Sequence, residues 1–271
     1  MKHFIHLMRL DKPIGTLLVL WPVLWALWLA NNGAPPLKLL IIFILGALIM
    51  RSAGCVVNDI FDRKFDRHVA RTTQRPLAQN KLSLKQAWIT FFILILLAFL
   101  LVLQLNLLTI MLACFAAGLT VLYPLCKRIT YLPQLVLGFT FNFGVLMAYS
   151  ASLNELPFMA WLLFCVSVIW TVAYDTLYAM TDKADDIKIG LKSTAILFGR
   201  YDGLITYILY LLFFAGIFSI GLINHLGPVF GIFAIISACW TFYPSKTPLK
   251  AFLANNITGL LIFLGFLVTL Y

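Results

Sequence analysis

Charged side chains are scarce in this sequence: Asp, Glu, Lys and Arg together make up 11% of its 271 residues. A soluble chain of this length normally carries about twice that fraction. Apolar runs of about 20 residues instead recur from one end to the other, and that length crosses a bilayer as a helix. The shortage of charge therefore excludes an ordinary soluble protein and predicts an all-α polytopic membrane protein.

Cysteine and histidine are also few, at five and four residues. They are scattered without the spacing of zinc or haem sites, and an odd number of cysteines in or beside apolar segments argues against a disulfide framework. The net charge of +10 does not lie on a soluble, aromatic-interleaved domain. A nucleic-acid partner is therefore not expected.

The apolar segments predict nine transmembrane helices in one domain, 1–271. Their ranges are 13–32, 36–57, 84–105, 106–123, 133–152, 157–178, 203–223, 227–243 and 252–270. The first segment follows a basic start, as in a signal peptide, but it is of full span length and no small-residue cleavage site follows it. We therefore interpret it as an uncleaved first span.

Basic residues predict the orientation of these spans. If the N-terminus is cytoplasmic, the cytoplasmic segments and adjoining span ends hold every lysine and arginine except Lys38 and Arg51. Positive charge is favoured on the cytoplasmic side of membrane proteins. The pattern thus predicts a cytoplasmic N-terminus and a C-terminus on the outer side, with Lys38 outside and Arg51 within the second span.

Carboxylates gather in two connections on the predicted cytoplasmic side. They are Asp59, Asp62 and Asp66 after the second span, and Asp182, Asp185 and Asp186 after the sixth. Because an even number of spans separates the two clusters, both emerge on the same membrane face. They are therefore predicted to face one another across a shared cavity.

Helical spacing predicts two acidic stripes. Asp59, Asp62 and Asp66 fall within roughly a 60° arc if they share one helix. Asp182 and Asp186 form a second stripe with Asp175 if the sixth helix continues past Met180. The alternative is a pair of solvated helix ends neutralised by Arg63, Lys64, Arg67 and Lys183. Like charges on one helix face repel, so two matching clusters favour bound cations.

Carboxylates with interleaved basic residues suit a divalent cation bridged to phosphate. Mg²⁺ prefers oxygen ligands, and it commonly takes one or two carboxylates together with substrate phosphate oxygens. Arginine and lysine would neutralise the remaining charge of a diphosphate. A site embedded in a membrane implies that the rest of such a ligand is a lipid.

The same residues resemble a known family. The stretch "NDIFDRKFD" resembles the NDxxDxxxD motif of the UbiA superfamily of intramembrane prenyltransferases, and "DKADD" fits its DxxxD motif. Longer stretches, among them "GCVVNDIFDRKFDRHVARTTQRPL", "YPLCKRITYLPQ" and "DDIKIGLKSTAILFG", resemble the branch that prenylates 4-hydroxybenzoate. The resemblance covers nearly the whole chain.

The resemblance implies nine helices around a central cavity, capped on the cytoplasmic side by the two Asp-rich connections. It also implies transfer of a polyprenyl chain from polyprenyl diphosphate to the ring carbon ortho to the hydroxyl of 4-hydroxybenzoate. This reaction is a Mg²⁺-dependent step of ubiquinone biosynthesis in the bacterial inner membrane. The lipid bilayer is thus a partner, and no feature of the sequence specifies an oligomeric state.

Residue roles follow by matching these motifs. One Mg²⁺ is expected at Asp59, Asp62 and Asp66, and a second at Asp182 and Asp186. The expected diphosphate ligands are Asn58, Arg71, Arg75, Tyr123 and Lys127. Arg128 is the candidate for the carboxylate of the aromatic acceptor. As alternatives, Arg71 and Arg75 would anchor lipid phosphates, and Lys127 and Arg128 would only set topology.

Three other functions stay open at this point. A related prenyltransferase could use haem, a naphthoate or homogentisate as acceptor. A cation transporter also places acids in membrane spans, but nearer the midplane than these. A lipid-binding or assembly protein would have no need of two facing acidic stripes.

Overall fold

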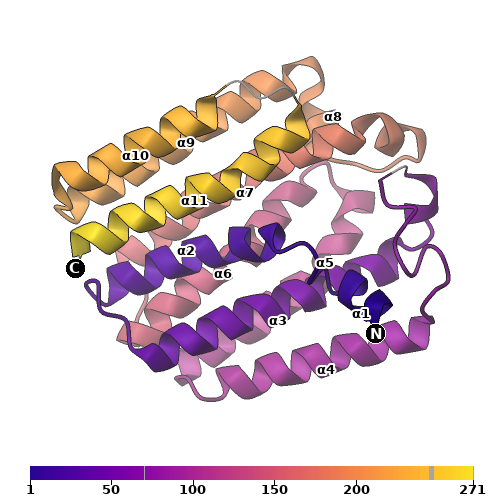
Figure 1. Cartoon of the computed structure of the whole chain (residues 1–271), viewed down its shortest axis with the longest axis horizontal. Helices are drawn as coiled ribbons and strands as arrows, with labels where there is room; N and C mark the ends of the chain where they lie inside the picture. The colour runs from indigo at the N-terminus through magenta and orange to yellow at the C-terminus, as the bar shows by residue number, and fades with distance from the viewer. Residues whose placement is uncertain (70, 244–246, 271) are drawn as a thin grey trace.

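Helices account for the regular secondary structure in residues 1–69, 71–243 and 247–270, which the computed structural model describes. The long helices, shown in Figure 1, are α2 (Ile14–Ala30), α3 (Leu37–Asp62), α4 (Leu84–Val102), α5 (Leu107–Ile129), α6 (Pro133–Leu153), α7 (Phe158–Lys188), α9 (Asp202–Ile223), α10 (Gly227–Phe242) and α11 (Pro248–Leu270). The short elements are α1 (Lys2–Leu7), α8 (Thr194–Phe198) and two 3₁₀ turns, η1 (Asp66–His68) and η2 (Gly199–Tyr201).

The predicted spans correspond to these long helices. Within residues 1–69, 71–243 and 247–270, seven apolar helical segments are long enough to cross a membrane, and α2 and α10 are shorter apolar helices of 17 and 16 residues. The expectation of an all-α polytopic membrane protein is confirmed. Three helices continue well past the ends of their predicted spans, because α3 runs to Asp62, α5 to Ile129 and α7 to Lys188. The extensions of α3 and α7 carry aspartates.

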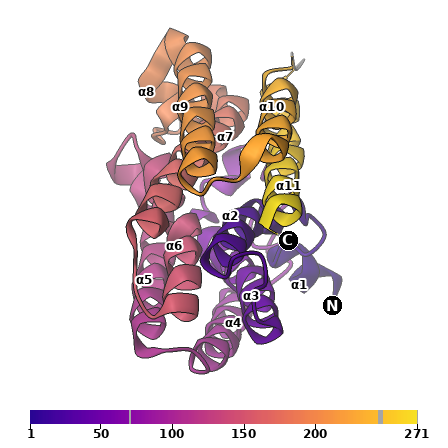
Figure 2. The ribbon, with the colours of Figure 1, turned by 90° about the vertical axis from the view of Figure 1, so that its left-hand side faces the viewer.

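The long helices lie side by side, and α2 is central among them. It packs against α3, α6, α7 and α11, whereas α4 lies at one edge of the bundle, as Figure 2 shows from the end. Helices α9 and α10 complete the opposite side by packing on α7 and α11. Helix α4 packs mainly against α3.

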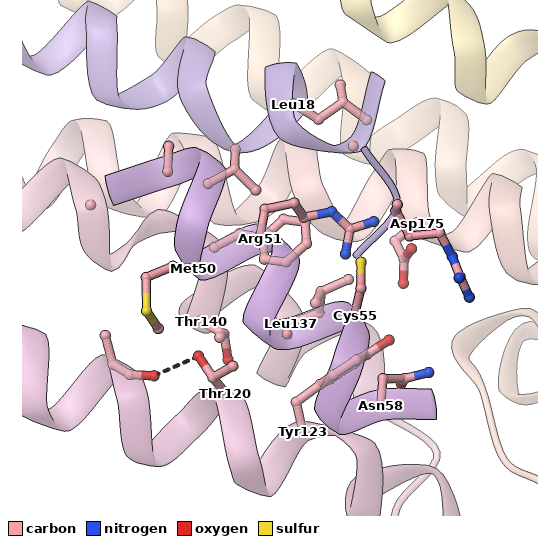
Figure 3. Close-up of a pocket in the computed structure, with 18 of the residues that line it drawn as sticks. Leu18, Met50, Arg51, Cys55, Asn58, Thr120, Tyr123, Leu137, Thr140 and Asp175 are labelled. Carbon is pink, nitrogen blue, oxygen red and sulfur yellow. Dashed lines mark hydrogen bonds between the residues drawn. The ribbon is translucent and has the colours of Figure 1, made fainter. Parts of the chain in front are cut away.

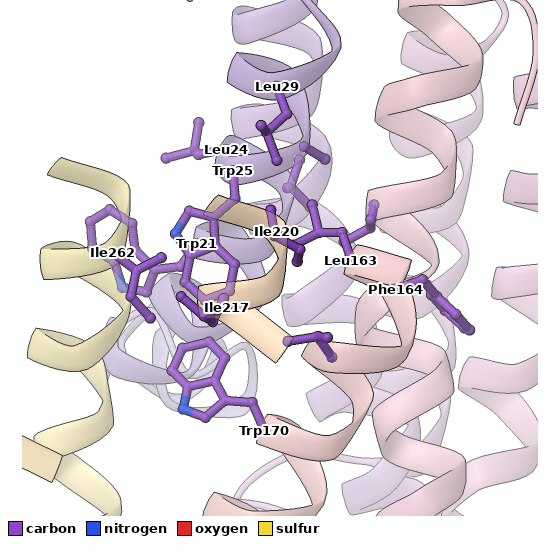
Figure 4. Close-up of a cluster of buried hydrophobic side chains, with 14 of the residues drawn as sticks. Trp21, Leu24, Trp25, Leu29, Leu163, Phe164, Trp170, Ile217, Ile220 and Ile262 are labelled. Carbon is purple, nitrogen blue, oxygen red and sulfur yellow. The ribbon is translucent and has the colours of Figure 1, made fainter. Parts of the chain in front are cut away.

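An aromatic core joins α2, α7 and α9 on one side of α2 (Figure 4). Trp170 lies between Trp25 and Phe213, with ring centroids 5.2 and 5.4 Å away. Its Nε1 donates to Asn255 Oδ1 of α11 at 2.8 Å, so the buried polar atom is satisfied. This packing fixes α7, which carries the second aspartate cluster, against the rest of the bundle.

Local signals explain the helix boundaries nearest the site. After α3 ends, Phe65 N donates to Asp62 O, and the chain turns into η1. Ser83 begins α4 with a capping box that it forms with Gln86. Between them, residues 71–82 form a connection without a regular helix, held near η1 by Thr72 Oγ1, which donates to Asp66 O at 3.0 Å.

Candidate active site

A cavity of about 1110 Å³ lies inside the bundle. Helices α2 to α7 bound it, and the first turns of α11 add Leu249, Phe252 and Leu253. One end is lined by acidic and basic side chains, and the rest is mostly apolar. Figure 3 shows Arg51, Tyr123 and Asp175 around the same space. The polar end lies at the C-terminal ends of α3, α5 and α7.

The first aspartate motif is held together by an arginine. Asn58 and Asp59 line the cavity from the last turns of α3. Arg75 Nη1 lies 3.0 Å from Asp59 Oδ1 and 2.9 Å from Asp66 Oδ2, so it bridges the two carboxylates. Arg9 Nη2 donates to both oxygens of Asp59, at 2.9 and 3.1 Å. The buried carboxylates are thus neutralised by two guanidinium groups.

The predicted single-helix stripe is wrong for its third member. Helix α3 ends at Asp62, and Asp66 lies in η1 after an intervening turn. Asp66 nevertheless rejoins Asp59 through Arg75. Burial raises the pKa of the Asp66 carboxyl to about 6, although Arg75 opposes this shift.

Asp62 lies beside the cavity rather than in its lining. Lys127 Nζ is 3.6 Å from its Oδ2, and Arg128 Nη2 is 3.8 Å from its Oδ1. The buried Oδ1 has no hydrogen-bond partner among the described residues. A buried carboxylate oxygen without a partner is costly, so this atom is suited to accept a further ligand.

The second motif forms the expected stripe. Helix α7 continues past Met180 to Lys188, and Asp175, Asp182 and Asp186 all line the cavity from it. Arg71 Nε donates to Asp182 Oδ1 at 2.9 Å, and its guanidinium lies 4.5 Å from the centre of the Tyr178 ring. Of the two predicted clusters, Asp59 lines the same cavity as Asp182 and Asp186, whereas Asp62, Asp66 and Asp185 are absent from its lining.

One connection links the two motifs. Residues 71–82 carry Arg75, which binds the first motif, and Arg71, which binds the second. The backbone N–H of Lys192, after α7, also donates to Lys127 O at the end of α5, at 2.9 Å. Three segments that are distant in the sequence are therefore fixed around the polar end of the cavity.

The residues present fit magnesium and diphosphate better than a closed metal cage. Within the described residues, no three or more Cys, His, Asp or Glu side chains converge on one point. Mg²⁺ needs only one or two carboxylates when substrate phosphate supplies other oxygens. Carboxylates from two helices line the cavity among arginine and lysine side chains, as such a ligand requires.

The remaining predicted residues divide into two groups. Tyr123 and Lys127 line the cavity, and Lys127 Nζ lies 5.9 Å from the Tyr123 ring centre. Arg128 does not line it. Its Nη2 donates to Phe61 O at 2.8 Å, and its guanidinium lies 5.0 Å from the Phe65 ring centre.

Sequence reasoning assigned no role to Arg9 or Arg51, although both line the cavity. Arg51 lies in α3, and in the described part of the chain its buried Nε has no hydrogen-bond partner. Gly15 of α2 makes room for it, because a Cβ there would lie 2.6 Å from Arg51 Nη2. A signal was present, since an ionisable residue inside a membrane span is a functional candidate by default.

The fold and this cavity define an intramembrane prenyltransferase: the chain belongs to the UbiA prenyltransferase family, whose sequence profile matches residues 19–269. It is 51% identical to the 4-hydroxybenzoate octaprenyltransferase of Pseudomonas aeruginosa (strain UCBPP-PA14), over 97% of this chain and 91% of that protein. The enzyme of the same name from Pseudoalteromonas translucida (strain TAC 125) is also 51% identical, over 98% and 94% of the two chains. The family resemblance is confirmed.

Solved structures show the same fold. A UbiA homologue from Aeropyrum pernix K1, solved in its apo form, has a TM-score of 0.77 and 23% identity, covering 93% of this chain and 97% of that one. A UbiA homologue from Archaeoglobus fulgidus, bound to GPP and Mg²⁺, has a TM-score of 0.72 and 16% identity, covering 99% of each chain. At these identities the likeness is one of fold.

Proposed function

We propose that this protein transfers a polyprenyl chain from polyprenyl diphosphate to the ring carbon ortho to the hydroxyl of 4-hydroxybenzoate, in ubiquinone biosynthesis. The near-complete match to enzymes named for this acceptor supports the substrate. The observation that carries the chemistry is one cavity with two aspartate motifs at its polar end and an apolar remainder. The whole chain, 1–271, acts as a single transmembrane prenyltransferase domain.

Magnesium is the proposed cofactor. One or two carboxylates of the set Asp59, Asp62 and Asp66 would hold one Mg²⁺ together with phosphate oxygens, and those of Asp182 and Asp186 would hold the other. When bound, the metal stabilises the negative charge that develops on the departing diphosphate. The unpartnered Oδ1 of Asp62 supports this assignment, as does the solved relative bound to GPP and Mg²⁺.

Basic side chains of the site would bind the diphosphate itself. Arg71, Arg75 and Lys127 lie at the polar end, and the two arginines pair with motif carboxylates. Phosphate oxygens offer these cations the same charge-assisted hydrogen bonds. Asn58 and Tyr123 line the same end and can donate hydrogen bonds to the phosphate oxygens.

The acceptor carboxylate needs a cation inside the cavity. Arg128 was the sequence candidate, but it contacts Phe61 and Phe65 outside the cavity lining. Arg51 has the better position, because it lies in the lining with an unpartnered Nε. We therefore assign acceptor binding to Arg51. Apolar walls around the remaining space would keep the allylic cation from water.

The proposed location is the bacterial inner membrane, with a cytoplasmic N-terminus and the polar end of the cavity toward the cytoplasm. Charge distribution supports this orientation. Lys38 lies at the other end of the bundle, where its Nζ donates to Gln104 O at 3.3 Å, and the remaining lysines and arginines outside the spans belong to the predicted cytoplasmic segments.

Prenyl transfer by the purified protein tests this proposal. Membranes or detergent micelles would contain the protein, octaprenyl diphosphate and 4-hydroxybenzoate, with product measured by mass spectrometry. We expect turnover with Mg²⁺ or Mn²⁺ and none in excess chelator. Full turnover in chelator would contradict the metal assignment. Preferential prenylation of a dihydroxynaphthoate or of homogentisate would instead contradict the proposed acceptor.

A further inference from the structure

Arg71 contacts two side chains of α7. Its Nε donates to both oxygens of Asp182, at 2.9 and 3.1 Å, and its Nη1 donates to the hydroxyl oxygen of Tyr178. Its guanidinium carbon also lies 4.5 Å from the centre of the Tyr178 ring. Tyr178 and Asp182 are four residues apart on one helix, so they lie on the same face. One arginine thus has both a carboxylate partner and an aromatic partner.

These two partners differ when the proposed ligands are bound. Asp182 then gives carboxylate oxygens to Mg²⁺, and the positive charge of the metal weakens the attraction between this carboxylate and Arg71. The ring face of Tyr178 attracts a guanidinium through its quadrupole, and this attraction does not use the oxygens that the metal needs. Tyr178 is therefore the partner that can keep Arg71 in place beside the diphosphate.

The ring of Tyr178 packs on the first turns of α11. The Phe252 ring lies 4.7 Å from it, centre to centre, and both residues line the cavity. One turn further along α11, Asn255 Oδ1 accepts hydrogen bonds from Trp170 Nε1 at 2.8 Å and from the Tyr210 hydroxyl at 3.0 Å. These buried bonds hold α11 against α7 and α9 without using an aspartate. The support behind Tyr178 is thus independent of the metal site.

We propose that Tyr178, packed against Phe252, is a positioning residue that presents Arg71 to the diphosphate of the prenyl donor. Its ring and hydroxyl keep the guanidinium at the polar end of the cavity when Asp182 binds metal. This inference rests on the proposed function, since it takes Arg71 as a diphosphate ligand and Asp182 as a metal ligand. Tyr178 acts only through Arg71.

Binding of geranyl diphosphate, with Mg²⁺ and without acceptor, tests this role. Arg71→Gln should raise its Kd by at least about tenfold, through loss of a charge-assisted contact to phosphate. Tyr178→Leu removes ring and hydroxyl and should raise the Kd by about tenfold, whereas Tyr178→Phe keeps the ring and should raise it by only about threefold. Tyr207→Leu is the matched control and should leave the Kd unchanged, because Tyr207 is 50% exposed and absent from the cavity lining.

A double variant shows whether Tyr178 acts through Arg71. In Arg71→Gln protein, adding Tyr178→Leu should raise the Kd no further, because residues that act as a unit are not additive. A further rise equal to that of Tyr178→Leu alone would overturn the positioning role, as would a wild-type Kd in Tyr178→Leu. An unchanged Kd in Arg71→Gln would instead contradict the proposed diphosphate site, and this inference with it.

Trypsin cleavage after Arg71 gives a measurement without metal or donor. Asp182→Asn removes the carboxylate charge, so Tyr178 alone should still hold Arg71 and keep cleavage slow. Adding Tyr178→Leu to Asp182→Asn should speed cleavage by about tenfold, because exposed, unanchored connections are the preferred sites of proteolysis. Cleavage after Arg200, which is exposed in η2, is the internal control. Equally fast cleavage after Arg71 in the single and double variants would overturn the proposal.

Discussion

At the polar end of the site, individual aspartates pair with basic side chains. Asp62 faces Lys127 and Arg128, and Asp182 pairs with Arg71. Each aspartate belongs to a different motif and a different helix. Because the proposed function assigns one Mg²⁺ to each motif, we expect the loss of either carboxylate to impair the reaction.

Asp62→Asn and Asp182→Asn should each lower kcat by at least about two orders of magnitude, because each removes charge that holds the metal at the leaving group. Steady-state prenyl transfer measures this effect. Asp202→Asn is the matched control, since Asp202 pairs with Lys183 at 2.7 Å outside the cavity lining. Similar losses in all three variants would indicate damage to folding rather than to a metal site.

Arg51 and Arg128 make opposite predictions about the acceptor. Arg51→Gln should raise KM for 4-hydroxybenzoate by at least about tenfold, through loss of a charge-assisted hydrogen bond, with little change in KM for the diphosphate. Arg128→Gln should change the acceptor KM much less. Wild-type protein should use phenol poorly, and Arg51→Gln should reduce its preference for 4-hydroxybenzoate over phenol. A larger acceptor effect at Arg128 would return that role to it.

At the scale of helices, the approach of α11 to α2 and α7 depends on Gly259. A Cβ there would lie 2.4 Å from a Trp21 ring atom and 2.9 Å from a Trp170 ring atom. Both rings are buried, so they have little room to shift. This contact brings α11 close enough for its first turns to complete the cavity.

Gly259→Ala should therefore lower the free energy of unfolding by about 1–3 kcal/mol through overpacking. The thermal midpoint in detergent measures this change. Gly231→Ala is the control, because Gly231 lies in α10 with no atom within 4 Å of its Cβ position, and alanine favours helix there. A midpoint unchanged in Gly259→Ala would show that the rings yield without cost.

For the whole molecule, the orientation of the bundle predicts which side of the membrane reaches the site. Glu155 lies in the α6–α7 connection and Lys64 in the turn after α3, and both are exposed. With a cytoplasmic N-terminus, Glu155→Cys should react with a membrane-impermeant maleimide in intact cells, whereas Lys64→Cys should react only after permeabilisation. The reverse pattern would place the active site on the outer side.

Sequence alone determined the membrane class, the positions of the spans and the side on which the aspartates are predicted to emerge. These properties depend on the hydropathy and charge of contiguous residues, which any helix in a bilayer must satisfy locally. The periodicity of Asp175, Asp182 and Asp186 likewise predicted their shared face, because they lie on one unbroken helix. The aspartate motifs also sufficed to identify the family, since each is a short run of neighbouring residues.

Only the tertiary structure decided which charges meet. Arg71 reaches Asp182 across 111 positions, and Arg9 reaches Asp59 across 50. Asp66 lies in η1 rather than on α3, because the chain turns after Asp62. Arg75 contacts both Asp59 and Asp66 and so holds the two carboxylates close together. Such pairs depend on how helices pack, since side chains distant in the sequence become neighbours only when their helices are in contact. Packing likewise turned Arg51 into the cavity and left Arg128 at its margin.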